Sequence, residues 1–264
     1  MNNVNKTLYI PLYGKAYVSG KGIILSDKKA EEIWQQEQFP IKGKSKSKWL
    51  AYYMGMRAAV YDGWVKEQRA LFPNAVIVHI GCGMDSRALR VGTKGSLWYD
   101  VDFPDVIAER ARYYPQTDTY RMLPSDVRNT AWLLPVPDGR EAIIIMEGIS
   151  MYLKPDEMQQ LLAEMNRHFG SVRLLVDVYT SLAAKISKYK NPINDVGVTT
   201  VYGVDDPTQM EQDTGLAFVK EHSITPPSLI NQLNRWEKTI FRPLFAGRIS
   251  RKMYRLYEYQ SRLS

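Results

Sequence analysis

The chain has 264 residues, of which 45% are hydrophobic, and it carries a net charge of +7. This length suits one large α/β domain or two small ones, and the apolar share is enough to build a core. No stretch approaches the roughly 18 apolar residues of a membrane span, and residues 1–6 lack the apolar centre of a secretory signal. The single cysteine, Cys82, excludes an internal disulfide, and three histidines add too little for a plausible zinc site. We therefore expect a cytoplasmic protein without a membrane partner or a metal ion.

Basic residues gather in two places, which raises the question of a nucleic-acid partner. They are Lys42, Lys44, Lys46 and Lys48 in an alternating run, and Arg248, Arg251, Lys252 and Arg255 towards the C-terminus. No recognisable nucleic-acid module accompanies them, so a solvated face or the attraction of an acidic substrate explains them better. The sequence therefore predicts no nucleic-acid partner, and it makes no prediction of the oligomeric state.

The first 74 residues contain no strand pattern. Residues 7–17, which include Pro11, predict an irregular arm. A short helix is expected over residues 27–36, with Ser26 or Asp27 as its cap. Apolar side chains keep a helical spacing over residues 47–72, which predicts a long helix that ends before Pro73.

From residue 75 onwards, short apolar segments alternate with helical patterns. The predicted strands cover residues 75–80, 96–101, 120–123, 141–146 and 172–178, and the predicted helices cover residues 85–91, 104–114 and 155–169. Such alternation indicates an α/β fold with a doubly wound, mostly parallel sheet and right-handed crossovers. The ligand of such a sheet lies beyond the carboxyl ends of the strands. We expect these residues to cluster there: Gly81, Asp102, Asp126, Glu147 and Asp177.

The pattern loosens after residue 180. Turn signals at residues 191–195 and 205–207 predict a lid or substrate-covering insertion over residues 181–214. A strand at 216–222, a helix at 227–241 and a last strand at 254–263 follow, with a helix as the alternative for the last segment. We divide the single domain of residues 1–264 into a helical cap (1–74), a cofactor-binding core (75–180), the lid (181–214) and a C-terminal part of the sheet (215–264).

The glycine-bent turn after the first strand is the most informative motif. Gly81 and Gly83 allow backbone N–H groups to approach a nucleoside, and Asp102, about 20 residues later, can accept both ribose hydroxyls. A dinucleotide fingerprint has a third glycine where Ser86 stands, and Asp85 would lie badly beside a diphosphate. The turn therefore favours S-adenosylmethionine, whose ammonium and sulfonium are positive, over NAD. Asp85 also suits an N-cap on the next helix.

Several segments follow a distinctive pattern in their order and spacing. They are residues 10–16, 27–30, 80–87, 99–104 and 147–153, together with Arg57, Asp62 and Asp126. This pattern resembles the leucine carboxyl methyltransferase family of class I S-adenosylmethionine-dependent methyltransferases, and within it the bacterial O-methyltransferases of polyketide biosynthesis. The resemblance implies a Rossmann-like, seven-stranded sheet with an N-terminal helical cap. Lys15 and Ser86 stand where that branch commonly carries arginine and threonine.

The resemblance also implies roles for individual residues. Arg57 is expected to bind the methionyl carboxylate of the cofactor, and Glu147, beside Gly148, to lie near its amino group. The turn residues Gly81, Gly83 and Asp85 are expected to contact the methionine and ribose. Asp102 is expected to bind the ribose hydroxyls, and Asp126 the adenine amino group. Met151 and Tyr152 are candidate walls of the methyl-transfer pocket, and no catalytic residue is identified.

Each assignment has a structural alternative. Arg57 could be a helix-surface arginine paired with an acid, Asp126 the cap of a helical turn, and Met151 and Tyr152 plain core residues. The remaining candidates are interpreted as structural: Asp100 as a buried acid, Arg87 as a partner of Asp62, and His79 and His168 as packing residues. His222 is a weaker candidate for a base.

The predicted activity is transfer of a methyl group from S-adenosylmethionine to a carboxylate or hydroxyl oxygen of a small, polyketide-like molecule, with S-adenosylhomocysteine as the product. No histidine lies among the motif residues, which favours a carboxylate or an acidic hydroxyl because neither needs a base. Two alternatives are a methyltransferase of protein C-terminal carboxylates and a cofactor-binding protein without activity. Asp85 and Ser86 disfavour an NAD-dependent oxidoreductase.

Overall fold

The computed structural model describes residues 8–37, 39, 43–187, 200–247, 250 and 252–262. Its helices are α1 (Tyr9–Gly20), α2 (Lys28–Glu37), α3 (Lys48–Leu71), α4 (Arg87–Val91), α5 (Pro104–Arg110), α6 (Pro155–His168), α7 (Ser181–Ser187), α8 (Pro227–Ile230) and α9 (Arg235–Phe241). Short 3-10 helices are η2 (Gly43–Lys46), η3 (Thr130–Leu133), η4 (Ser150–Tyr152) and η6 (Pro207–Met210), and η7 (Arg242–Ala246) continues α9 as a π-helix. The strands are β1 (Val76–Ile80), β2 (Trp98–Asp102), β3 (Tyr120–Pro124), β4 (Glu141–Met146), β5 (Ser171–Tyr179), β6 (Leu216–His222) and β7 (Tyr254–Ser261).

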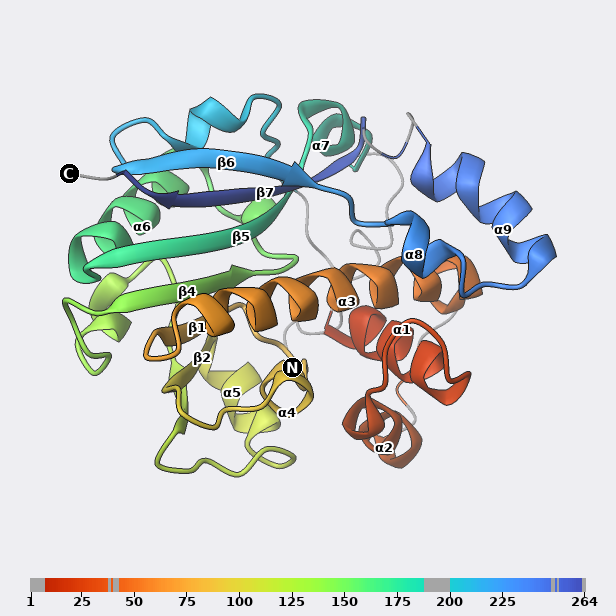
Figure 1. Ribbon diagram of the computed structural model, residues 1–264, viewed down its shortest axis with the longest axis horizontal. Coiled ribbons are helices and arrows are strands. Elements are labelled where there is room, and N and C mark those ends of the chain that lie inside the picture. The colour runs from red at the N-terminus through yellow and green to blue at the C-terminus, as the bar shows by residue number, and fades with distance from the viewer. Residues whose placement is uncertain are drawn as a thin grey trace.

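The strands form one seven-stranded sheet in the order β3-β2-β1-β4-β5-β7-β6 (Figure 1). Strands β1 to β5 run parallel, and β7 lies antiparallel between β5 and β6. Ile80, at the end of β1, lies opposite Val101 of β2 and Met146 of β4, so the loops after these strands leave the sheet close together. The prediction of a doubly wound, mostly parallel sheet is confirmed.

Helices cover both faces of the sheet, and the alternation of side chains along each strand divides the core into two layers. Ile77 of β1 points into the layer that contains Met56 of α3. Its neighbour Val78 points into the other layer, where Leu162 of α6 packs. Because both faces are covered, residues 142–146 of β4 are buried and continuously apolar, as is typical of parallel sheets.

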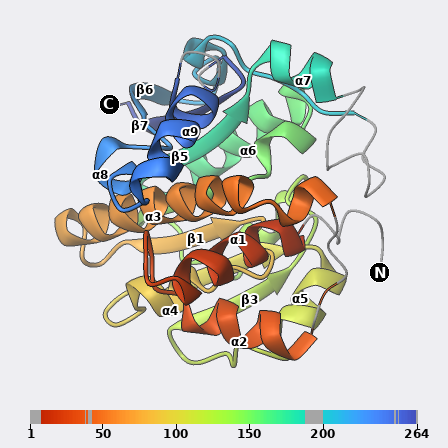
Figure 2. The ribbon, with the colours of Figure 1, turned by 90° about the vertical axis from the view of Figure 1, so that its right-hand side faces the viewer.

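The N-terminal segment contradicts one prediction. The irregular arm expected over residues 7–17 is wrong, because Tyr9–Gly20 form helix α1. Pro11 is tolerated because it lies in the first turn, where a helix needs no backbone N–H. Figure 2 shows α1 lying against α3. The two helices approach closely at Gly14, where an added Cβ would lie 2.7 Å from Met54 Cβ.

The other N-terminal helices agree with the sequence. Helix α2 begins after Asp27, whose Oδ1 accepts the backbone N–H of Ala30 at 2.9 Å. Helix α3 begins after Ser47, whose side chain accepts the N–H of Trp49, and it runs for 24 residues. In Figure 1, α3 lies along the direction of the strands, and its N-terminal part extends past their carboxyl ends.

The C-terminal part holds one further correction. Residues 227–241 form two helices instead of one, because Asn234 caps α9 by accepting the N–H of Glu237 at 2.9 Å. In the predicted lid, Ser181–Ser187 form α7, whereas residues 188–199 lie outside the described part of the chain. The last strand is confirmed over Tyr254–Ser261. None of the described helices is both long and apolar enough to cross a bilayer.

Candidate active site

A cavity of about 480 Å³ opens beyond the carboxyl ends of β1 and β4. Its walls come from α1, α3, the loops after these two strands, α7 and the segment around η7. One end is ionic and carries Lys15, Arg57, Asp85 and Glu147. The other end is apolar and rich in aromatic and methionine side chains, among them Tyr53, Met151, Tyr179, Phe245 and Met253. A cavity of this size suits a small-molecule site.

The glycine turn after β1 has the backbone that its sequence predicts. Gly81 and Gly83 have φ values of 66° and 49°, in the left-handed region that favours glycine. A Cβ at Gly81 would lie 2.7 Å from Ile149 Cδ1, and one at Gly83 would lie 2.9 Å from Leu8 Cδ2. Both glycines line the cavity, so the turn offers bare backbone to a ligand.

Arg57, in the middle of α3, is held between two carboxylates. Its Nε donates to Glu147 Oε1 at 2.9 Å, and its Nη1 donates to Asp177 Oδ2 at 3.0 Å. The same Nη1 donates to the hydroxyl of Tyr254 at 2.8 Å. Arg57 is buried and lines the cavity. The alternative of a helix-surface arginine is therefore wrong, although Arg57 is paired with acids.

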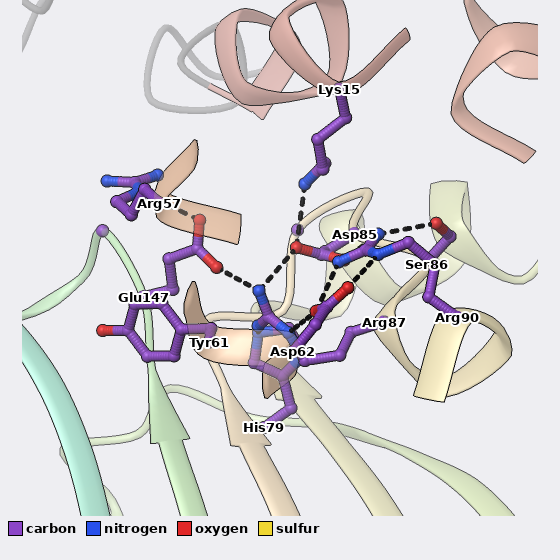
Figure 3. Close-up of polar contacts among 12 residues, drawn as sticks. Lys15, Arg57, Tyr61, Asp62, His79, Asp85, Ser86, Arg87, Arg90 and Glu147 are labelled. Atoms are coloured by element: carbon purple, nitrogen blue, oxygen red, sulfur yellow. Dashed lines mark hydrogen bonds and ion pairs between the residues drawn. The ribbon is translucent and has the colours of Figure 1, made fainter. Parts of the chain in front are cut away.

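Glu147, directly after β4, joins Arg57 to a second arginine. Its Oε2 accepts a hydrogen bond from Arg87 Nη2 (Figure 3). Burial acts to raise the pKa of Glu147, but the guanidinium groups of Arg87 and Arg57 lower it to about 2. The carboxylate is therefore ionised at neutral pH. Gly148 follows with a φ of 73°, and its N–H donates to Asp177 Oδ1 at 2.6 Å.

Asp85 joins the glycine turn to the N-terminal helix. Its Oδ2 lies 2.8 Å from Lys15 Nζ of α1, and its Oδ1 lies 2.9 Å from Arg90 Nη1. Burial acts to raise the pKa of Asp85, but Arg87, Arg90 and Lys15 hold it well below its usual range. The N-cap alternative for Asp85 is wrong, because Ser86 occupies that position of α4 and makes no side-chain cap bond.

The ionic end forms one buried network (Figure 3). Arg87 Nε donates to Asp62 Oδ1 at 2.8 Å, as predicted for this pair, and Arg90 Nε donates to Asp62 Oδ2 at 2.6 Å. Among the described residues, the network joins the cations Lys15, Arg57, Arg87 and Arg90 to the carboxylates Asp27, Asp62, Asp85, Glu147 and Asp177. With every group ionised, it carries one negative charge in excess.

Asp102 and Asp126, expected to bind ribose and adenine, do not line the cavity. Asp102 Oδ2 accepts the backbone N–H of Gly83 at 2.8 Å, and burial raises the pKa of Asp102 to about 6. Asp126 is more exposed. Its Oδ1 accepts Arg128 Nε at 2.9 Å and the backbone N–H of Arg128 at 3.1 Å, as its turn-cap alternative predicts. The structure therefore brings Gly81, Glu147 and Asp177 together, but not Asp126.

Tyr254 and Asp177 complete the site from the C-terminal half. Asp177 was predicted at the ligand end of the strands, whereas Tyr254 was not predicted. The Tyr254 hydroxyl donates to Asp177 Oδ2 at 2.6 Å. A carboxylate inside an apolar strand is a usable signal for Asp177, because a buried charge needs partners. Tyr254 had no such signal, since only the antiparallel insertion of β7 beside β5 brings it there.

The pocket-wall candidates Met151 and Tyr152, on η4, both line the cavity, and they also pack in a small apolar cluster with Ala184 and Val201. His79 also reaches the cavity, with Nε2 3.3 Å from Arg87 Nη1, and burial together with Arg87 lowers its pKa to about 4. It is therefore neutral at neutral pH.

The remaining histidines and Asp100 contact other parts of the fold. His168 Nε2 lies 2.9 Å from the carbonyl oxygen of Val136, and His222 Nε2 lies 2.6 Å from Glu258 Oε2. Neither ring lines the cavity, which removes His222 as a base. Asp100 is a buried structural acid, as predicted, and accepts Arg110 Nε at 2.9 Å. Within the described ranges, no group of three or more His, Cys, Asp or Glu side chains is placed to hold a metal ion.

Known proteins with similar sequences and folds are methyltransferases. Residues 10–166 match the family described as leucine carboxyl methyltransferase. The chain is 29% identical over 243 residues to the tetracenomycin polyketide synthesis O-methyltransferase TcmP of Streptomyces glaucescens, which covers 91% of this chain and 90% of that protein. It is also 31% identical to the S-adenosyl-L-methionine-dependent methyltransferase dpfgK of Gibberella zeae over 185 residues. This alignment covers 64% of this chain and 61% of that protein. The fold is similar to that of magnesium protoporphyrin IX methyltransferase (ChlM) from Synechocystis PCC 6803 with bound SAH, at a TM-score of 0.52, 12% identity and coverage of 98% and 100% of the two chains.

Proposed function

The chain belongs to the leucine carboxyl methyltransferase family and is an S-adenosylmethionine-dependent methyltransferase, and we propose that it methylates an oxygen atom of a small, aromatic, polyketide-like molecule. One observation carries the proposal: a single cavity joins an ionic end beside the glycine turn to an end lined by aromatic and methionine side chains. The ionic end suits a charged cofactor, and the apolar end suits an aromatic acceptor.

S-adenosylmethionine fits the ionic end in charge and in shape. Its sulfonium, ammonium and carboxylate give one net positive charge, which complements the single negative excess of the network. We assign its carboxylate to Arg57, because a guanidinium can donate two parallel hydrogen bonds. Its ammonium would lie against Glu147 or Asp85, which both line the cavity. Gly81 and Gly83 line the cavity, so their backbone would contact its ribose.

Asp102 and Asp126 belong to the proposed nucleoside site although neither lines the cavity. Each oxygen of Asp102 accepts one backbone N–H, from Gly83 and from Phe103. A carboxylate oxygen has two lone pairs, so each can also accept a ribose hydroxyl. Asp126 would have to share its carboxylate between Arg128 and the adenine amino group, so its contribution to affinity is expected to be smaller.

The apolar end is built for stacking instead of for ion pairing. The ring of Tyr254 lies 6.3 Å from that of Tyr53 and 5.2 Å from that of Tyr179, measured between centroids. Among the described wall residues, the cations are Lys15 and Arg57, and both are paired with carboxylates. Binding of the acceptor should therefore depend on apolar area and on aromatic contacts.

The residues of this chain contribute mainly by holding the two reactants in line. The bound cofactor supplies a methyl group on a positively charged sulfur. Tyr53 and Arg57 lie one turn apart on α3, so one rigid helix carries contacts to both ends of the cavity. Alignment of this kind can supply roughly 7–11 kcal/mol of the barrier. The lowered pKa of His79, about 4, makes it a weak base, so we expect an acceptor oxygen that is already ionised, as in a carboxylate or an acidic phenol.

The proposal is tested by calorimetry with S-adenosylmethionine and S-adenosylhomocysteine, with NAD as the control ligand. Labelled S-adenosylmethionine is then incubated with aromatic carboxylic acids, with phenols and with a peptide that ends in leucine. Transfer to the aromatic small molecules supports the proposal. Transfer to the peptide alone assigns the protein-carboxylate alternative, and cofactor binding without any transfer assigns the non-catalytic one.

A further inference from the structure

Exposed apolar side chains border the mouth of the cavity on two helices. Along α9 and η7, Trp236, Ile240 and Leu244 follow at four-residue intervals and are 81%, 42% and 57% exposed. On α7, Leu182 and Ile186 are 48% and 45% exposed. Residues four positions apart share one side of a helix, so each set forms a stripe. These five residues are called the apolar rim below.

The apolar rim is continuous with the apolar end of the cavity. Ile186 and Leu244 are exposed to solvent and also line the cavity wall, so they stand at its mouth. Their neighbours Ala183 and Phe245 line the cavity further in. In Figure 2, α7 and α9 both lie above α1 and α3. An apolar molecule at the rim therefore meets apolar surface on its way inward.

The exposed charged side chains on the rim helices themselves are basic, whereas Asp205 lies beside Lys185 of α7 and Glu221 lies near Phe245 and Ala246 of η7. Residues 227–247 contain one acid, Glu237, which is buried and accepts hydrogen bonds from Tyr52 and Lys48. The basic residues of the same segment are Arg235, Lys238 and Arg242, which are exposed or half-buried, and α7 adds the exposed Lys185. An apolar stripe with tryptophan and flanking arginine and lysine is typical of a helix that lies in the surface of an anionic membrane.

We propose that the apolar rim binds an anionic lipid surface, with Trp236 and its neighbours in the headgroup boundary and the basic side chains on the headgroups. Large exposed apolar patches mark sites of interaction. A second copy of this chain is a poorer occupant, because a symmetric contact would bring the same basic residues face to face. The absence of an apolar span and of a leader-like segment predicted no membrane partner, but a rim formed by two separate short helices needs neither feature.

Lipid binding by the rim does not depend on the identity of the acceptor. It would place the mouth of the cavity at the membrane surface. The class of ligand for the rim is therefore an anionic bilayer surface, whereas the class of ligand for the cavity is a small molecule.

Flotation with lipid vesicles tests the proposal directly. The full chain is expected to float with vesicles of equal parts phosphatidylcholine and phosphatidylglycerol, and much less with phosphatidylcholine alone. The double variant Trp236→Ser, Ile240→Ser should bind the anionic vesicles more than about tenfold more weakly, because two apolar side chains no longer leave water. Neither residue lines the cavity, so cofactor affinity should be unchanged.

Leu134→Ser is the matched control, because Leu134 is 85% exposed and follows η3, away from the cavity. It should float like the unmodified chain, and all variants should keep the same melting temperature. Equal flotation of the double variant and the unmodified chain would overturn the proposal, as would the absence of flotation. If light scattering shows that the unmodified chain is a dimer and that the double variant is a monomer, the rim would instead be assigned to self-association.

Discussion

Arg57 Nε and Glu147 Oε1 lie 2.9 Å apart, although the two residues are 90 positions apart in the chain. The pair connects α3 to the loop after β4, and Asp177 extends it to β5. A ligand carboxylate that binds Arg57 must share it with two protein carboxylates. Cofactor affinity should therefore be sensitive to every member of this set.

Arg57→Lys is expected to weaken S-adenosylmethionine binding by more than about tenfold, because an ammonium cannot reproduce the planar fork that serves two carboxylates and a ligand. Calorimetry measures the change. Arg69→Lys is the matched control on the same helix, since Arg69 donates to the carbonyl oxygens of Val91 and Gly92, outside the cavity. Equal affinities of the Arg57 and Arg69 variants would contradict the assignment of the cofactor carboxylate.

Gly81→Ala should impair both folding and cofactor binding, because a Cβ there would meet Ile149 at 2.7 Å in a backbone conformation with φ of 66°. Gly92→Ala is the control that adds backbone strain without a steric contact. Gly92 has a φ of 78° but no neighbour within 4 Å of an added Cβ, so its substitution adds backbone strain of about 1–2 kcal/mol alone. We expect Gly92→Ala to lower the free energy of unfolding and to leave cofactor affinity intact. Loss of affinity in both variants would show that strain, not the cavity, is responsible.

Cofactor affinity should fall on acidification because burial raises the pKa of Asp102 to about 6. The ribose hydroxyls donate to the ionised carboxylate, whose population falls roughly tenfold between pH 7 and pH 5. Binding of S-adenosylmethionine should weaken in parallel. Asp102→Asn should bind more weakly at pH 7 and vary less with pH. A flat profile of the unmodified chain would argue against Asp102 as the ribose ligand.

His79 should make the fold sensitive to acid. Burial and the nearby Arg87 lower its pKa from 6.5 to about 4, so between these values the unfolded chain takes up a proton that the folded chain does not. The free energy of unfolding therefore falls as the pH drops through this window, by at most about 3 kcal/mol. His79→Gln should remove this contribution, as denaturant titrations at a series of pH values would measure.

Asp102 has the opposite effect on the free energy of unfolding over much of the same pH range. Its pKa is raised from 3.8 to about 6, so the folded chain takes up this proton first and gains stability as the pH falls. The unmodified chain can therefore show a nearly flat stability profile, and the variants separate the two effects. His79→Gln should gain stability towards low pH, and Asp102→Asn should lose it. Parallel profiles of the two variants would contradict both assignments.

Local patterns in the sequence were enough to predict the cofactor-binding half of the fold. The apolar strands, the caps Asp27 and Ser47 and the glycine turn act over a few residues, and the structure agrees with them. The irregular arm was wrong because Pro11 was interpreted as a helix breaker, although it lies in the first turn of α1. The split of residues 227–241 depends on one cap, Asn234, inside an otherwise continuous helical pattern.

The ionic network could be predicted only in part, because most of its contacts join distant residues. The sequence indicated Arg57, Glu147 and the pair of Arg87 with Asp62. The contact of Lys15 with Asp85 spans 70 positions, and that of Tyr254 with Asp177 spans 77. No local spacing encodes either of them, since they depend on how α1 packs on α3 and on where β7 enters the sheet. The apolar rim also joins two separate segments.

Strand β7 lies between β5 and β6, so β6 can join the sheet only after β7 has been synthesised. Each of β2 to β5 pairs with a strand made before it and can join the sheet as it leaves the ribosome. Among the described strands, β6 pairs only with β7, so it must wait with its backbone groups unpaired until Tyr254 and the residues after it exist. Unpaired strand edges are sites of aggregation. A ribosome stalled before Tyr254 would therefore hold a chain in which β6 lacks its partner β7 and Arg57 lacks the hydroxyl of Tyr254.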